Sequence, residues 1–182
     1  MPKYISFLRG INMAGHYPVK MADLSALYKS LGFNDAETYI QSGNVIFSYE
    51  GDSQTADIAG RIESAILRRF SYNVPVMIRT TEELKKILAS NPFQAEHNFD
   101  PSKMIAIILY EKPGEEQLNK MKGIDYPPDK YEITGNEIFV YCPNGFGRTK
   151  LYTNFFEKKL GVIGTARNWK TITALLQLAK NR

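Results

Sequence analysis

The sequence has few of the residues that form covalent or metal cross-links. It contains 1 cysteine, Cys142, so no disulfide can form within the chain and its stability must come from a packed core. Its 2 histidines, His16 and His97, lie in polar segments without a cysteine, histidine or carboxylate at ligand spacing. We therefore expect no metal site, no cofactor and no catalytic residues among these side chains, and we expect Cys142 to be a small core residue.

Long apolar runs are also missing. No segment approaches the roughly 20 residues that cross a bilayer, and residues 1–4 lead into a strand-like run without the character of a signal peptide. The chain has 182 residues, of which 43% are hydrophobic and 23% charged, and this composition excludes disorder, collagen and a coiled coil. Together with the single cysteine, these features predict a cytoplasmic protein without a membrane partner, built as one large domain or two small ones.

Positive charge is concentrated at the C-terminal end of the sequence. Residues 144–182 contain 8 lysines and arginines against 1 acidic residue, whereas residues 91–143 contain 5 against 9. A basic segment of this kind favours an anionic partner, either phosphate on a small molecule or the backbone of a nucleic acid. The alternative is an ordinary solvated surface.

The hydrophobic pattern predicts the same order of elements twice. Strands are predicted over 4–8, 37–41, 44–49, 74–78, 104–110, 131–134, 137–142 and near 162–166. Helices are predicted over 21–31, from Asp52 or Ser53 to about 70, over 82–89 after a cap at Thr80 or Thr81, from Pro113, and over 150–160 and 171–180. We predict an α+β fold of two tandem ferredoxin-like (βαββαβ) halves, residues 1–92 and 93–182, each followed by an extra helix. A single mixed sheet shared by both halves is the rival fold.

A repeated octapeptide supports this duplication. The two copies match at an offset of 92 and are SGNVIFSY at residues 42–49 and TGNEIFVY at residues 134–141. In this register, side-chain alternation predicts that Phe47 and Phe139 point to the open faces of the sheets and that Ile46 and Ile138 point to the helices. Aromatic residues on an open face stack bases in RNA-recognition motifs, but we favour their burial against other apolar surface.

Several segments resemble a known family. They are RGINMAGHYPVKMADL at 9–24, TYIQSGNVIF at 38–47, YCPNGFGRTKLYTNFFEKKLG at 141–161 and TARNWKT at 165–171. With them the chain resembles, over nearly its whole length, the bacterial domain-of-unknown-function family numbered 1697. The resemblance implies a tandem of α-β plait domains, and it implies no activity and no catalytic residues.

Basic residues at predicted helix starts indicate a binding site. The segment NGFGRTK at 144–150 places two glycines and two cations where free N–H groups favour an anion, although it matches neither the dinucleotide fingerprint nor a P-loop. Predicted helices near Lys20, Lys150 and Lys170 begin with bases that oppose the helix dipole, and such violations are most frequent at functional sites. We predict one or more anion-binding surfaces. The candidate residues are Arg9, Asn12, Lys20, Gly145, Gly147, Arg148, Lys150, Arg167, Asn168 and Lys170, with Trp169 as a candidate stacking platform.

Three classes of function fit these observations. The first is non-catalytic binding of a phosphate-bearing ligand or a nucleic acid. The second is an enzyme that acts on a phosphorylated or otherwise anionic small molecule in a cleft between the halves, with Arg9, Arg148 and Arg167 holding the substrate. The third is a protein-interaction module that uses an open sheet face. A nucleic-acid partner predicts a steep dependence of affinity on salt, which separates it from a small ligand.

Overall fold

The computed structural model describes residues 1–51 and 53–181, which form an α+β protein with two four-stranded antiparallel sheets and six α-helices. The chain divides into two compact units. The first comprises Met1–Lys86 with the chain from Ala174 onward, and the second comprises Ile87–Thr173. The junction at residue 86 differs from the predicted boundary at 92, because tertiary contacts, and not the helix-breaking Pro92, define a compact unit.

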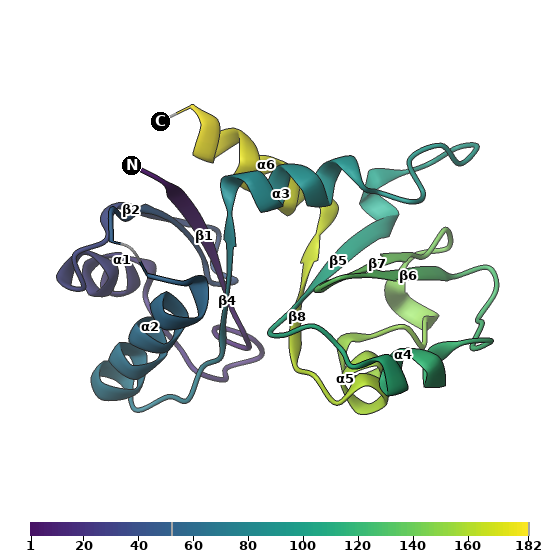
Figure 1. Cartoon of the computed structure of the whole chain (residues 1–182), viewed down its shortest axis with the longest axis horizontal. Helices are drawn as coiled ribbons and strands as arrows, with labels where there is room; N and C mark the ends of the chain where they lie inside the picture. Colours follow the sequence, from purple (N-terminus) through teal and green to yellow (C-terminus); the bar gives the residue numbers. More distant parts are fainter. Residues whose placement is uncertain (52, 182) are drawn as a thin grey trace. The chain divides into compact units, whose positions relative to one another are not determined.

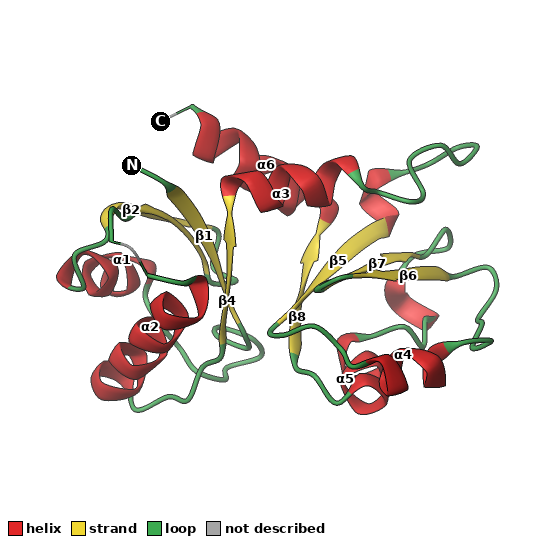
Figure 2. Cartoon of the chain, in the orientation of Figure 1, coloured by secondary structure: helices red, strands yellow, loops and turns green. Residues whose placement is uncertain are grey.

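The first unit alternates strands and helices in the predicted order (Figures 1 and 2). Its elements are β1 (Lys3–Leu8), α1 (Met21–Ser30), β2 (Asn34–Tyr39), β3 (Asn44–Ser48), α2 (Thr55–Phe70) and β4 (Val76–Thr80). The strand order is β2-β3-β1-β4. Helices α1 and α2 cover one face of this sheet, where Tyr28 and Ile62 join Phe47 and Val45 in one buried cluster.

The second unit has the same strand order. It contains β5 (Met104–Leu109), α4 (Glu115–Met121), β6 (Lys130–Thr134), β7 (Glu137–Tyr141), α5 (Thr153–Leu160) and β8 (Gly164–Asn168), paired as β6-β7-β5-β8. Helices α4 and α5 lie side by side, and Phe156 of α5 packs against Ile107, Ile138 and Val140 of the sheet. The remaining helices follow the last strand of each sheet directly and are α3 (Thr81–Ala89) and α6 (Trp169–Lys180).

The repeated octapeptide occupies two hairpins of different length, which corrects part of the prediction. In the first hairpin Tyr39 pairs with Asn44 across a four-residue loop, whereas in the second Thr134 pairs with Glu137 across two residues. The difference moves the two copies out of register, and a shift of one residue exchanges the faces of a strand. Phe47 therefore points to the helices and contacts Tyr28 edge to face at 5.4 Å, so the prediction for Phe47 and Ile46 is wrong.

Two predicted helix starts also need correction. Helix α2 begins at Thr55 after an N-cap residue Gln54 that makes no side-chain bond, so Ser53 is not its cap, and Asp52 lies outside the described residues. Helix α5 begins at Thr153, whereas the prediction began it at Lys150. The chain reaches α5 through a short 3-10 turn, Phe146–Arg148, and an extended link. None of the helices described for residues 1–51 and 53–181 has the length and apolar character to cross a membrane.

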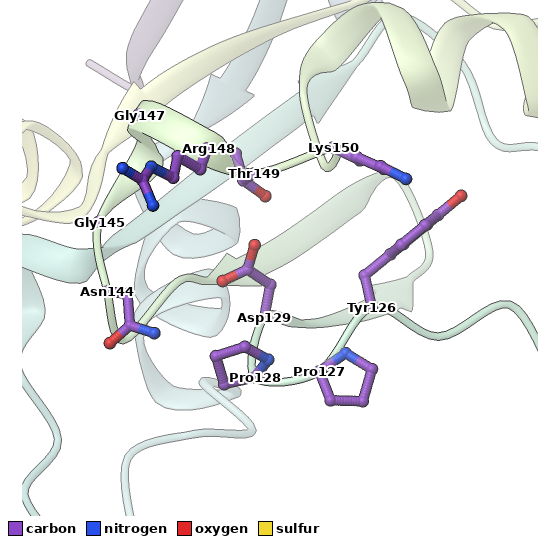
Figure 3. A pocket seen from close by; sticks show the side chains of 10 residues that line it. All are labelled: Tyr126, Pro127, Pro128, Asp129, Asn144, Gly145, Gly147, Arg148, Thr149 and Lys150. Atoms are coloured by element: carbon purple, nitrogen blue, oxygen red, sulfur yellow. The ribbon is translucent and has the colours of Figure 1, made fainter.

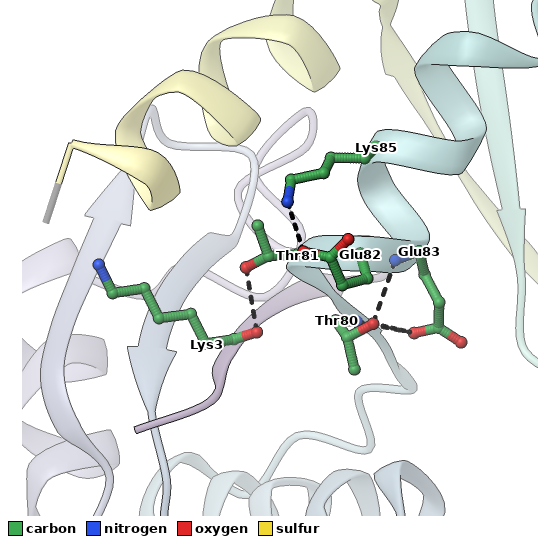
Figure 4. Close-up of polar contacts among 6 residues, drawn as sticks. All are labelled: Lys3, Thr80, Thr81, Glu82, Glu83 and Lys85. Atoms are coloured by element: carbon green, nitrogen blue, oxygen red, sulfur yellow. Dashed lines mark hydrogen bonds and ion pairs between the residues drawn. The ribbon is translucent and has the colours of Figure 1, made fainter.

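The junction of β4 and α3 shows why the chain changes from strand to helix there (Figure 4). The Thr80 hydroxyl accepts a hydrogen bond from the backbone N–H of Glu83 at 3.1 Å, and the Glu83 carboxylate accepts one from the backbone N–H of Thr80 at 2.7 Å. This reciprocal capping box occupies two donors that a helix start otherwise leaves open. Thr81 also donates to the Lys3 carbonyl at 3.2 Å, which ties the helix start to β1.

The capping box leads to a stability prediction. The substitution Thr80→Ala removes the side chain that accepts from the Glu83 N–H, so we expect the free energy of unfolding to fall by about 1 kcal/mol, measured by urea denaturation. The matched control is Gln54→Ala, because Gln54 occupies the N-cap of α2 without a side-chain bond. Equal losses in the two variants would contradict a specific role for the capping box.

Candidate functional site

A pocket of about 690 Å³ opens in the second unit between two connecting segments (Figure 3). One segment joins α4 to β6 and the other joins β7 to α5, so each is anchored at one end to the sheet. The pocket is lined by Tyr126, Pro127, Pro128, Asp129, Asn144, Gly145, Gly147, Arg148, Thr149 and Lys150. It brings together four of the residues that the sequence marked as anion-binding, namely Gly145, Gly147, Arg148 and Lys150.

The segment after β7 turns sharply to form one wall. The Gly145 N–H donates to the Cys142 carbonyl at 2.8 Å, and Gly145 has φ 84°, a conformation that disfavours residues with a side chain. A Cβ added at Gly145 would lie 3.6 Å from the Lys103 Nζ, so a third cation lies beside this turn. At Gly147 an added Cβ would meet nothing within 4 Å, which leaves the backbone of this wall open to a ligand.

The segment before β6 forms the opposite wall. Its Tyr126 and Asp129 face each other in a tight turn, where the Asp129 N–H donates to the Tyr126 carbonyl at 2.9 Å. The Tyr126 ring meets Phe155 of α5 edge to face at 5.7 Å, which fixes the ring against the helix. The Lys150 Nζ lies 5.5 Å from the centroid of the Tyr126 ring, so a cation–π contact joins the two walls.

The charged groups of the pocket have few partners in the protein. Arg148 and Lys150 are exposed, and in the described part of the chain the Arg148 guanidinium makes no hydrogen bond or ion pair. Asp129 is half-buried, and its carboxylate points toward Thr149, between Arg148 and Lys150 (Figure 3). Two cations and one carboxylate give the pocket a net positive charge, so it favours an anion that also offers a donor to Asp129.

The buried Thr149 lines the pocket, and its hydroxyl contacts the buried Cys142 thiol. The Thr149 hydroxyl accepts from the backbone N–H of Leu151 at 3.1 Å and from the Cys142 thiol at 3.5 Å. Burial raises the pKa of the Cys142 thiol, the nearby Asp129 carboxylate raises it further, and the hydrogen bond to Thr149 acts in the opposite direction. Cys142 is therefore a protonated core residue at neutral pH, as the sequence indicated, and its bond to Thr149 holds the chain between Arg148 and Lys150 in place.

The candidate residues of the first unit lie outside this pocket. Asn12 uses its whole carboxamide to brace its own loop, because its Nδ2 donates to the carbonyls of Val19 at 2.9 Å and Gln41 at 3.0 Å while its Oδ1 accepts from the Val19 N–H at 2.8 Å. Arg9 is half-buried after β1, and its N–H donates to the Pro75 carbonyl at 3.0 Å. Lys20 is exposed at the N-cap of α1, where Asp23 supplies an acid in the first turn.

The candidate residues at the junction of β8 and α6 are partly in the interior. Arg167 is 7% exposed, and its Nη1 donates to the Thr165 hydroxyl at 2.7 Å and to the Ala166 carbonyl at 2.9 Å. Burial lowers the pKa of Arg167 to about 10, so it remains charged at pH 7. Trp169 is 6% exposed and meets Phe139 edge to face at 6.1 Å, so it packs in the core and does not offer a stacking surface. Only Asn168 and Lys170 are exposed here.

The sequence did not single out the second wall. No recognised motif covers residues 126–129. Their only signal is a pair of prolines followed by an aspartate and then by a strand. They reach the pocket because β6 pairs with β7, which brings the two connecting segments to the same end of the sheet. Over residues 1–51 and 53–181, no three side chains of metal-ligating type gather at one place.

The burial of Cys142 leads to a prediction about its reactivity. We expect the thiol to react with Ellman's reagent in the native protein at least ~10-fold more slowly than a free thiol, because it is inaccessible and its raised pKa keeps it protonated. Unfolding in urea should release one equivalent of thiol, because the chain has 1 cysteine. Rapid reaction in the native state would contradict the burial of this thiol.

Comparisons with known proteins agree with this architecture. The chain is similar to a solved structure, the conserved bacterial protein SP0830 from Streptococcus pneumoniae, with a TM-score of 0.77 and 21% identity over 98% of each chain, which shows a shared fold. No curated protein matches the sequence. Residues 1–139 match the family described as "Protein of unknown function (DUF1697)", so the match includes the wall at Tyr126–Asp129 and ends before the glycine turn. Because the match covers most of the chain, the protein belongs to the DUF1697 family.

Proposed function

We propose that this protein binds a phosphate-bearing small molecule in the pocket of its second unit and that this binding is non-catalytic. The observation that carries the proposal is the position of Arg148 and Lys150 beside the Gly145–Gly147 turn, on the edge of a cavity of about 690 Å³. This volume lies within the range of roughly 300–1,000 Å³ that is common for small-ligand sites.

The chemistry of the glycine wall supports phosphate as the bound group. A guanidinium presents donors in a planar fork that matches two phosphate oxygens, and the Arg148 guanidinium has no partner among the described residues. The backbone at Gly147 has no side chain in front of it, so phosphate oxygens can approach closely. The sequence predicted that the anion binds at the start of a helix near Lys150. The helix α5 begins only at Thr153, beyond both cations, so the proposed site uses the turn before the helix and not the helix start.

A small ligand is favoured over a nucleic acid because two aromatic residues of the second sheet, Phe139 and Tyr141, are engaged in packing. Tyr141 stacks on Phe93 at 5.9 Å, and Phe139 meets Trp169. Stacking platforms for bases need exposed rings, and the rings at these positions are buried. An enzyme acting on the same phosphate compound stays the alternative function.

We also propose that each unit is a ferredoxin-like plait and that the two arose by internal duplication. The shared order of elements, the antiparallel strand orders β2-β3-β1-β4 and β6-β7-β5-β8, and helices on one face of each sheet support this description.

A cytoplasmic location is proposed from the single free cysteine, because reducing compartments keep thiols unpaired.

Titration calorimetry with methyl phosphate and inorganic pyrophosphate tests the proposed ligand class. We expect Arg148→Ala to weaken binding of both by about 10-fold or more, because a charge-assisted hydrogen bond contributes about 1.5–3 kcal/mol. Lys150→Ala should weaken binding less, because Lys150 also contacts the Tyr126 ring. The control is Lys158→Ala, which removes an exposed cation of α5 that does not line the pocket.

Two results would contradict the proposal. One is an affinity for methyl phosphate that is the same in Arg148→Ala and the wild type. The other is binding confined to oligonucleotides, with an affinity that falls steeply as salt is raised, which would assign the site to a nucleic acid.

A further inference from the structure

The proposed phosphate pocket contains an acid whose position phosphate binding does not explain. Asp129 is half-buried and points into the pocket toward Thr149 (Figure 3). Over the described residues, neither Arg148 nor Lys150 forms an ion pair with it. A ligand that is only a phosphate would place a second negative charge near this carboxylate, which weakens binding. Within the protein the Asp129 carboxylate interacts with the Cys142 thiol, which can occupy only one of its acceptor positions. The remaining acceptor positions suit a neutral donor of the ligand.

We infer that the ligand is a phosphate ester that also carries hydroxyl groups, a sugar phosphate or a ribonucleotide, with its hydroxyls donating to Asp129 and its phosphate on Arg148. This inference rests on the proposed function, since it uses the same pocket and the same phosphate contact. A carboxylate accepts hydrogen bonds from two neighbouring hydroxyls, which is how acidic residues hold the ribose in dinucleotide-binding proteins.

The balance of charges favours hydroxyls over an ammonium group as the partner of Asp129. The pocket has two cations, Arg148 and Lys150, and one anion, so a cationic group on the ligand would be repelled by more charges than attract it. A hydroxyl is a neutral donor and meets no such repulsion. Its hydrogen bond to an ionised acceptor is among the stronger bonds that a neutral group makes.

The shape of the pocket agrees with a ligand larger than phosphate. A volume of about 690 Å³ leaves room for a sugar beside the phosphate, and Arg148 and Asp129 belong to opposite walls. The wall that carries Asp129 also includes Tyr126 and the prolines at 127 and 128, which offer apolar surface to the carbon face of a sugar or to a base. A ligand with a phosphate at one end and hydroxyls at the other spans both walls.

Calorimetry with matched ligands tests the inference on the wild-type protein. Ribose 5-phosphate is compared with methyl phosphate, and AMP is compared with its 2′,3′-dideoxy analogue. We expect each hydroxyl-bearing ligand to bind at least about 10-fold more tightly than its partner, as hydrogen bonds to a charged acceptor imply. Comparison of AMP with ribose 5-phosphate then shows whether a base adds affinity, which separates the nucleotide from the sugar phosphate.

The substitution Asp129→Asn tests the acceptor. It should reduce the preference for ribose 5-phosphate over methyl phosphate to less than about 3-fold, while binding of methyl phosphate itself is unchanged or tighter because a like charge is removed. The control is Asp125→Asn, an exposed acid of the same segment that does not line the pocket. The thermal midpoint of each variant verifies that it is folded.

The possible failures are distinguishable. Equal affinity of the wild type for the members of each matched pair overturns the inference and leaves phosphate binding intact. A preference that survives in Asp129→Asn overturns the role of this residue. Absence of binding by any phosphate compound overturns the proposed function together with the inference.

Discussion

The alternation of side chains along β7 is the constraint on which both the core and the pocket depend. Ile138 and Val140 point to the helices and pack on Phe156, and the next residue of the same parity, Cys142, continues this row beyond the end of the strand. Because the Cys142 thiol donates to the Thr149 hydroxyl, the core row also fixes the segment that carries Arg148 and Lys150. The exposed cations are thus held by a buried contact on the helix side of the sheet.

The second wall depends on the same sheet through the pairing of β6 with β7. Tyr131 pairs with Val140 and Lys130 with Tyr141, so the segment before Lys130 emerges at the end of the sheet where β7 finishes. Its tight turn then places Asp129 opposite the glycine turn, and the Tyr126–Phe155 contact holds it against α5. Opposite charges therefore face each other across open space, because each is carried by a different rigid connection.

How much of this could be predicted depends on whether the signal was local. Strand and helix order, a helix cap at Thr80 or Thr81 and the core position of Cys142 follow from short patterns, and the structure contains all three, with Thr80 as the cap. The face of Phe47 depends on the length of its hairpin loop. Aligning the two octapeptides at an offset of 92 ignores the difference in loop length, and it therefore places the first strand one residue out of register with the second. The hairpin of β6 and β7 could be predicted from its two-residue turn, but residues 126–129 carry no motif, so nothing in the sequence marked Asp129 as lining the same pocket as Arg148.

The availability of its arginine, and not the local density of positive charge, distinguishes the pocket from the sites of Arg61 and Arg167. Arg61 lies over the Phe33 ring at 5.0 Å and donates to the Tyr49 hydroxyl and the Leu31 carbonyl, so its guanidinium already serves the first unit. Arg167 is buried and donates to Thr165 and Ala166. Each would have to break these bonds before it could hold a phosphate, which costs much of what the new contact contributes. Arg148 has no such bonds to break within the described chain, and it lies beside a backbone that no side chain covers at Gly147. Net charge predicted a basic C-terminal segment. The hydrogen bonds of the individual arginines show that, of Arg61, Arg148 and Arg167, Arg148 is the one that can give its full donor capacity to a ligand.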